Sequence, residues 1–183
     1  MNNRETCLPW LATTALPAWS QQQVLLSDGV SPDQRWNECG ETCVSMLAAA
    51  VWGARLSPDA LRAATNGVAG SGLTNGTDIA NQASYANVVM RSIDTGPAFA
   101  QALITAMVAD GRPVMILGEW PTPGGVLHWL LATSTAAGGV SYINPGGGVH
   151  SSITWPVFSE LYRGTVVESR AHLHVDASGW ELP

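Results

Sequence analysis

The hydrophobic pattern of this chain changes type near its middle, and that change restricts the fold more than any other feature. In the first half, apolar residues recur at helical spacing, most clearly over residues 41–52 and 99–109. After Pro113, they occur in short runs separated by Gly and Pro, which is typical of antiparallel strands. The sequence therefore predicts an α+β domain in which N-terminal helices pack on a C-terminal antiparallel β-sheet.

The expected elements can be placed from their start and stop residues. Ser57 followed by Pro58 is a typical N-cap and first position of a helix, and Gly111 is typical of a helix end. We expect helices over about 41–52, 58–64, 77–83, 99–109 and 154–163. We expect strands over about 23–26, 87–91, 114–117, 127–132, 140–143 and 165–175. Residues 1–30 are interpreted as a lead-in segment and residues 31–183 as a single domain.

The composition argues against several classes of partner. Of the residues, 46% are hydrophobic and 12% are charged, which is typical of a chain that folds by itself. The 8 Lys and Arg against 14 Asp and Glu give a net charge of −6, which repels a nucleic-acid backbone or an anionic lipid surface. No apolar run approaches the ~18 residues of a membrane span, and the N-terminus lacks the features of an export signal. We therefore expect a cytoplasmic protein with no nucleic-acid partner and no membrane span.

Three cysteines, Cys7, Cys39 and Cys43, cannot all pair within one chain, which favours a reducing compartment or a thiol kept free for chemistry. Cys39 directly precedes Gly40 and the first predicted helix. A thiol at a helix N-terminus beside an imidazolium has a lowered pKa, because the dipole and the cation both favour the thiolate. Cys43, one turn later, is expected to be a small buried core residue. Cys39 is therefore the candidate nucleophile.

A cysteine nucleophile needs a base, and His128 lies in the predicted strand 127–132. Asn144 ends the next predicted strand, and a hairpin would place it opposite His128, where it could fix the tautomer of the ring. The plainer interpretations are a structural histidine and a simple Asn-Pro-Gly turn. The other histidines, His150 in a Gly-rich loop and His172 and His174 on the last predicted strand, have no comparable partner.

The chain resembles the C39-type peptidases, which are papain-like cysteine peptidases. The resemblance begins at residues 38–47, ECGETCVSML, because that family enters its first helix through an acidic residue, Cys and Gly. Further matching segments follow in the family's order, and together they cover about residues 33–165. They are Trp52-Gly53, 56–61, Gly76-Thr77, 111–114, 128–133, 143–145 and Phe158.

The resemblance implies a papain-like fold and a thioester mechanism. It assigns Cys39 as nucleophile, His128 as acid and base, Asn144 as the residue that orients the ring, and Gln34 as the oxyanion-hole side chain. Two positions depart from the family pattern. Asn144 stands where the family usually has Asp, and Gln34 is one residue closer to Cys39 than the family spacing, which falls on Asp33. No cofactor and no metal are expected.

The substrate implied by the resemblance is a peptide. Exporter-fused relatives cut leader peptides, but this chain is expected to be a free-standing member. Free-standing relatives include phage enzymes that degrade cell walls, so a peptidoglycan peptide is our hypothesis for the target, with an endolysin released by host lysis or carried by a virion. Two alternatives stay open: an inactive peptide-binding module on the same fold, and an acyl transferase that shares the thioester. The sequence gives no indication of the oligomeric state.

Overall fold

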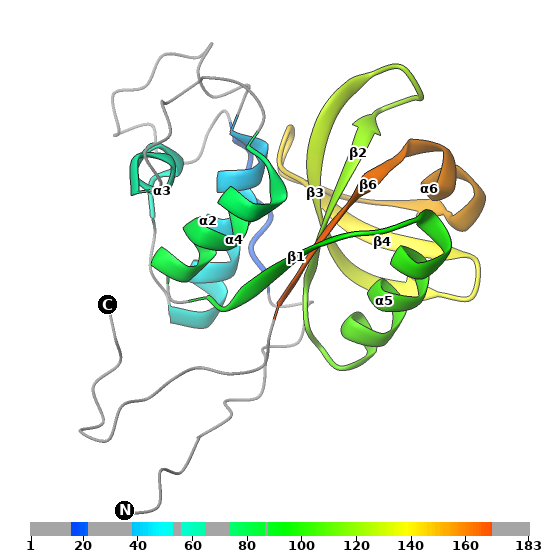
Figure 1. The fold of residues 1–183 in the computed structure, drawn as a ribbon, viewed down its shortest axis with the longest axis horizontal. Helices are drawn as coiled ribbons and strands as arrows, with labels where there is room; N and C mark the ends of the chain where they lie inside the picture. The colour runs from blue at the N-terminus through cyan, green and yellow to red at the C-terminus, as the bar shows by residue number, and fades with distance from the viewer. Residues whose placement is uncertain (1–15, 22–37, 53–55, 65–73, 87, 170–183) are drawn as a thin grey trace, which may run out of the picture.

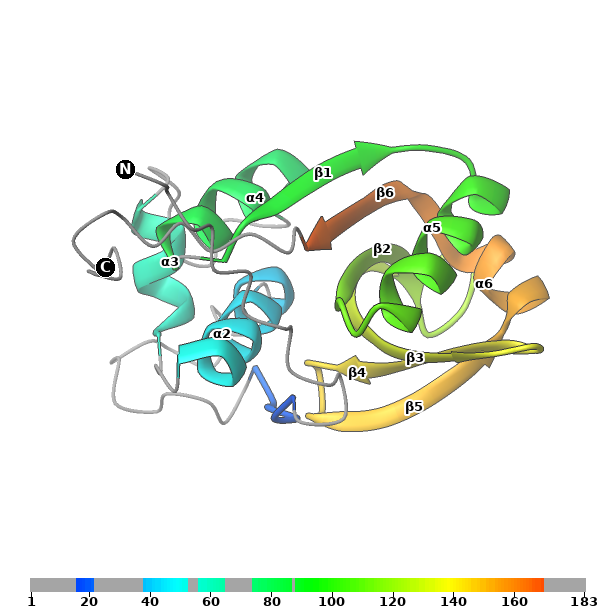
Figure 2. The same cartoon turned by 90° about the horizontal axis from the view of Figure 1, so that it is seen from below.

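The computed structural model describes residues 16–21, 38–52, 56–64, 74–86 and 88–169, and the account below concerns these residues. A central sheet separates two groups of helices (Figures 1 and 2). One group is α2 (Cys39–Trp52), α3 (Pro58–Ala64) and α4 (Gly76–Tyr85), and the other is α5 (Pro97–Ala109) and α6 (Trp155–Leu161). None of the described helices combines the length and the hydropathy needed to cross a membrane.

The sheet has six antiparallel strands in the order β1-β6-β2-β3-β4-β5. Their bounds are β1 Met90–Asp94, β2 Val114–Trp120, β3 Val126–Ala136, β4 Gly139–Asn144, β5 Val149–Thr154 and β6 Tyr162–Ser169. Because β1 pairs with β6, the end of the helical half of the chain is tied into the sheet built by the second half. The predicted α+β architecture, with N-terminal helices on an antiparallel sheet, is confirmed.

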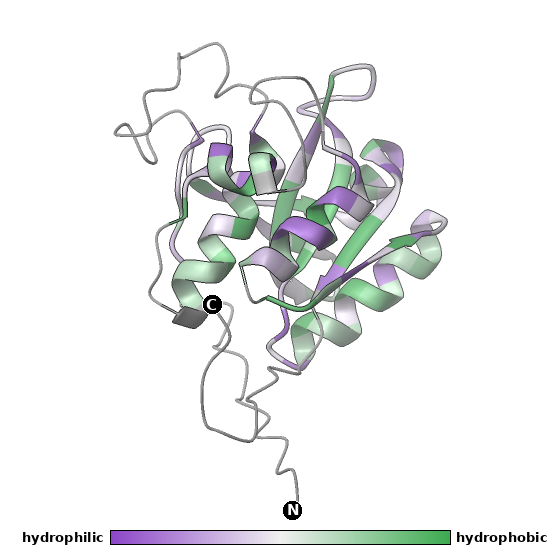
Figure 3. Ribbon diagram, turned by 60° about the vertical axis from the view of Figure 1, so that its left-hand side comes forward, coloured by the Kyte–Doolittle hydropathy of each residue, from purple (hydrophilic) through white to green (hydrophobic). Residues whose placement is uncertain are grey.

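Both faces of the central strands β2 and β3 are largely buried, and alternate residues of a strand face different cores. On β3, Trp129 and Leu131 pack with α2 and α4, whereas Ala132 packs in the second core beneath α5 and α6. Most of α5 is hydrophobic, and it covers this second core (Figure 3). The burial of both faces explains why the central strands lack a clean alternation of polar and apolar residues.

The expected hairpin between the His128 strand and the Asn144 strand is confirmed. Strands β3 and β4 pair antiparallel, with Leu131 opposite Ile143 and Ala132 opposite Tyr142. This register brings the start of β3 and the end of β4 to the same end of the sheet. The side chains of His128 and Asn144 therefore come from adjacent strand ends.

The other predicted elements agree with the structure to within a few residues, with one clear omission. The predicted helices correspond to α2–α6, and β1 begins at Met90 rather than at residue 87. Strand β5 was not expected, because its sequence VHSSIT is mostly polar and lies exposed at the sheet edge. The expected strand 23–26 and the part of the last strand beyond residue 169 lie outside the described residues.

Part of the predicted lead-in segment packs on the domain. Leu16 is buried in the core beneath α2, and the main-chain N–H of Trp19 donates to the sulfur of Met46 at 3.3 Å. The N–H of Gln21 donates to the carbonyl oxygen of Pro145 at 2.6 Å. Residues 16–21 therefore connect α2 to the turn that follows Asn144.

Gly40 allows the first turn of α2 to approach β3. A Cβ at this position would lie 3.0 Å from Cδ1 of Trp129, and it would clash with Cδ1 of Ile79. Both neighbouring side chains are fully buried. The close approach of helix and strand therefore requires a residue without a side chain.

We predict that Gly40→Ala destabilises the protein. Overpacking costs about 1–3 kcal/mol, and the better helix propensity of Ala offsets up to about 1 kcal/mol of it. The expected net loss in the free energy of unfolding, measured in urea, is about 1–2 kcal/mol. Gly138→Ala is the matched control, since a Cβ there meets no heavy atom within 4 Å. Equal stability of the two variants would contradict this view of the packing.

Candidate active site

The Cys39 thiol lies where the first turn of α2 meets the start of β3. Its sulfur accepts a hydrogen bond from the main-chain N–H of Trp129 at 3.3 Å, although the two residues are 90 positions apart. Cys39 is 3% exposed, and it forms no disulfide. The residue before Trp129 is His128, so the fold brings the predicted nucleophile to the strand segment that carries the predicted base.

The imidazole of His128 is held by Asn144. Its Nε2 atom lies 2.8 Å from Oδ1 of Asn144, and the same oxygen accepts the main-chain N–H of Gly146 at 2.8 Å. The Gly146 donor fixes which end of the Asn144 amide faces the ring, because an N–H group requires the oxygen. An oxygen acceptor in turn requires the proton on Nε2. In the neutral ring, Nδ1 therefore has the free lone pair of a base.

Burial controls the charge of the thiol. Burial raises the pKa of Cys39 to about 12, and the hydrogen bond from the Trp129 amide is the largest opposing influence. The carboxylate of Glu41 also raises this pKa, whereas the amides of Gly40 and of Cys39 itself lower it. The sequence-based expectation of a lowered thiol pKa was therefore wrong for this state, because desolvation outweighs the helix terminus.

Burial also favours the neutral form of the imidazole. Burial lowers the pKa of His128, and the hydrogen bond with Asn144 opposes that shift more weakly. The thiol and the imidazole do not share a hydrogen bond with each other in the described part of the chain. Burial thus favours the neutral form of both the thiol and the imidazole, and Nδ1 of the neutral ring has a free lone pair.

The structure describes three of the four predicted site residues. Asn144 contacts the His128 ring, and the Cys39 sulfur contacts the main-chain amide of Trp129, the residue after His128. Gln34 lies outside the described residues, as do Cys7, His172 and His174. Cys43 is fully buried in α2, as expected for a core residue, whereas His150, which we expected in a loop, lies exposed on strand β5.

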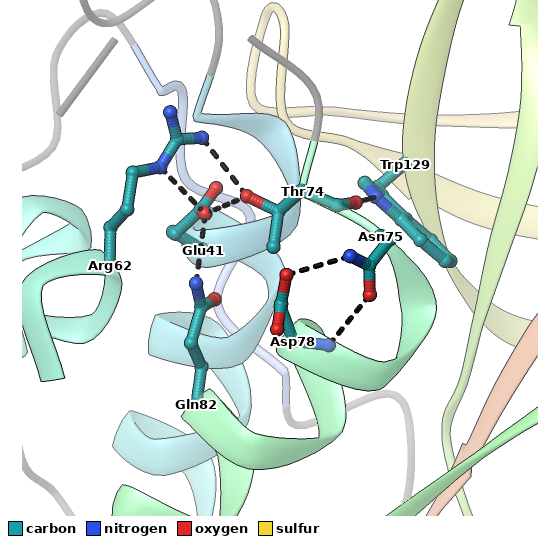
Figure 4. A network of polar contacts seen from close by, with 7 residues as sticks. All are labelled: Glu41, Arg62, Thr74, Asn75, Asp78, Gln82 and Trp129. Carbon is teal, nitrogen blue, oxygen red and sulfur yellow. Dashed lines mark hydrogen bonds and ion pairs between the residues drawn. The ribbon is translucent and has the colours of Figure 1, made fainter. Parts of the chain in front are cut away.

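Sequence reasoning missed a buried polar cluster around Glu41, two residues after Cys39 (Figure 4). The carboxylate of Glu41, in the first turn of α2, accepts Nε of Arg62 at 2.9 Å and Nε2 of Gln82 at 3.1 Å. The hydroxyl of Thr74 also donates to it. The available clue was the pair of acidic residues that flank the Cys-Gly dipeptide.

Glu38 is the second acidic residue of this cluster. It directly precedes Cys39 and is 1% exposed. Burial, a hydrogen bond with Asp59 and the negative charges of Asp59 and Glu41 raise its pKa to about 8, and the cation of Arg62 opposes them. Glu38 is therefore protonated at neutral pH, which limits the negative charge buried near the thiol.

No protein-family model and no curated protein sequence matches this chain. Solved structures do match it. A double-glycine-motif protease from an AMS/PCAT transporter, in complex with its leader peptide, aligns with a TM-score of 0.52 and 14% identity over 73% of this chain and 85% of that one. The peptidase domain of Streptococcus ComA, a bifunctional ABC transporter, aligns with a TM-score of 0.56 and 14% identity over 72% and 90%.

A third similar structure is the N-terminal peptidase C39-like domain of a toxin secretion ATP-binding protein from Vibrio parahaemolyticus. It aligns with a TM-score of 0.48 and 18% identity over 73% of this chain and 98% of that chain. The first two structures establish the class of fold. This chain has the α+β, papain-like fold of C39 peptidase domains, as the sequence resemblance implied.

The raised pKa of Glu38 predicts how stability depends on pH. The folded state binds a proton at Glu38 up to about pH 8, whereas the unfolded chain releases it near the ordinary value of 4.5. The stabilising contribution is therefore complete below pH 4.5 and is lost as the pH rises to about 8. Within this window, the slope approaches about 1.4 kcal/mol per pH unit.

Glu38→Gln, which mimics the protonated acid, tests this dependence. We expect the variant to be more stable than the native chain at pH 8, with the advantage vanishing towards pH 4.5, as measured by urea unfolding. Asp110→Asn, at an exposed carboxylate on the far side of the sheet, is the control. A stability difference between native and Glu38→Gln that stays constant with pH would contradict the raised pKa.

Proposed function

We propose that this protein is a cysteine peptidase in which Cys39 attacks the amide carbonyl, His128 transfers the proton and Asn144 orients the imidazole. The observation that carries the proposal is the meeting of two contacts on consecutive residues of β3. The Trp129 amide donates to the Cys39 sulfur at 3.3 Å, and the His128 ring is fixed by Asn144 at 2.8 Å. The likeness of the fold to peptidase domains supports the same conclusion.

The proposed reaction follows from the tautomer of His128. As the sulfur attacks, the thiol proton moves to Nδ1, while Nε2–H stays on the oxygen of Asn144. The imidazolium then protonates the leaving amine, and a thioester remains on Cys39. Water, deprotonated by the same ring, hydrolyses the thioester and frees the thiol. Gln34 stays the predicted oxyanion-hole donor.

The substrate that we propose is a peptide. One of the similar structures holds a leader peptide, which supports a peptide as the class of substrate. The peptidoglycan target and the endolysin role stay predictions from the sequence.

The two alternatives differ from a peptidase in what the site does with an acyl group. A binding module would have no use for a base of fixed tautomer, so the His128–Asn144 pair favours an enzyme. An acyl transferase would form the same thioester but pass the acyl group to an acceptor other than water. Product analysis by mass spectrometry distinguishes them, because only a peptidase yields a free carboxylate without an added acceptor.

The two cysteines of α2 provide a matched test of the nucleophile. We predict that Cys39→Ala abolishes cleavage of a peptide library while the fold is retained. Cys43→Ala, one turn away and fully buried, should stay active but lose on the order of 1 kcal/mol in the free energy of unfolding. Equal loss of turnover in the two variants would mean that the wrong thiol or the wrong mechanism has been assigned.

Asn144 tests the role of the ring partner. Asn144→Ala leaves the imidazole free to rotate, so we expect kcat to fall by roughly 10- to 100-fold. This loss is a part of the rate enhancement that general acid–base catalysis contributes. Asn144→Asp keeps an oxygen acceptor for Nε2 and should retain more activity than Asn144→Ala. An Asn144→Ala enzyme with native kcat would show that the amide does not orient a catalytic ring.

A further inference from the structure

Thr74 connects the buried cluster on the helices to the strand that carries the site (Figure 4). Its hydroxyl donates to the carboxylate of Glu41 and accepts Nη2 of Arg62 at 3.1 Å. Its main-chain carbonyl oxygen accepts Nε1–H of Trp129 at 2.8 Å. Thr74 thus holds the indole of the residue whose amide contacts the Cys39 sulfur.

These contacts form a closed circuit around the thiol. Cys39 and Glu41 are two residues apart in the first turn of α2. Glu41 binds the Thr74 hydroxyl, Thr74 binds the Trp129 indole, and the Trp129 amide returns to Cys39 at 3.3 Å. Three separate segments of the chain are therefore fixed against one another by polar contacts next to the sulfur.

Burial and further contacts fix each of the residues in this circuit. Glu41 and Trp129 are fully buried, so their polar groups have no water to exchange with. Asn75 caps α4 through the N–H of Asp78 at 2.9 Å, which fixes the backbone directly after Thr74. The indole also lies against Gly40, where no side chain can push it away. The position of the Trp129 amide is thus determined by packing and by hydrogen bonds together.

We propose that Thr74 and Trp129 are positioning residues for the Cys39 thiol, holding the Trp129 amide where it stabilises the negative charge that develops on the sulfur. A hydrogen bond from an N–H group to an anion is stronger than one to a neutral acceptor, so it favours the thiolate. In the resting state this amide already lowers the thiol pKa more than any other group. The role of these residues in peptide cleavage rests on the proposed function. Their effect on the reactivity of the Cys39 thiol can be measured without it.

Alkylation of Cys39 by iodoacetamide, followed by peptide mapping on the full-length protein, measures that reactivity. Thr74→Val removes the hydroxyl at nearly constant volume, and Thr74→Ser restores it. Between pH 7 and 9, we expect Thr74→Val to react about tenfold more slowly than the native chain, the equivalent of one pKa unit, and Thr74→Ser to react at nearly the native rate.

A merely structural role predicts the opposite sign. Destabilised proteins open more often, so a buried thiol would be alkylated faster in a variant that had only lost stability. Ser45→Ala is the matched control, because Ser45 lies on α2, as Cys39 does, but its hydroxyl donates to the carbonyl of Leu56 at 2.8 Å and takes no part in the contacts of Thr74. We expect Ser45→Ala to lose comparable stability but to show equal or faster alkylation of Cys39.

A second variant keeps the test decisive if Thr74→Val does not fold. Trp129→Phe removes the Nε1–H donor to Thr74 while its own main-chain amide remains, and it should also slow alkylation. Native or faster alkylation in the variants that fold would overturn the proposal. Slower alkylation in a protein that cleaves no peptide would instead refute the proposed function and leave the positioning role standing.

Discussion

The packing of the first turn of α2 on the start of β3 is the constraint on which the rest of the site depends. Gly40 lets the indole of Trp129 lie against the helix, and the Trp129 amide then reaches the sulfur of Cys39 at 3.3 Å. Since His128 directly precedes Trp129, the same register also fixes the backbone position of His128. A shift of one residue in β3 would exchange the faces of both side chains and dismantle the site.

The same packing determines the charges. Excluding water raises the pKa of Cys39 and lowers that of His128, so the resting pair is neutral. The protonated state of Glu38 limits the negative charge near the thiol. A neutral thiol is a poor nucleophile towards oxidants and adventitious electrophiles. In the proposed mechanism the thiolate forms as the proton moves to His128, so the resting thiol reacts more slowly than a thiolate would.

Much of the fold could be predicted from the sequence, because the apolar periodicity on which it rests is local. The hairpin that pairs β3 with β4 followed from two short apolar runs, and Cys39 from its place before Gly40. Strand β5 could not be predicted, since an exposed edge strand needs no apolar residues. The thiol pKa was also beyond local reasoning, because it depends on burial by segments distant along the chain. The Glu41 cluster escaped for the same reason, as its partners come from α3 and α4 and from Thr74.

The central claim is that the Cys39 sulfur accepts an acyl group, and the most direct measurement is the mass of the enzyme quenched in acid during turnover of a peptide ester. The account predicts a covalent acyl adduct that maps to the peptide containing Cys39, that decays in neutral buffer and that is absent from Cys39→Ala. An acyl group found on Cys43 would contradict the account. So would a Cys39→Ala variant that still cleaves the ester although it forms no adduct.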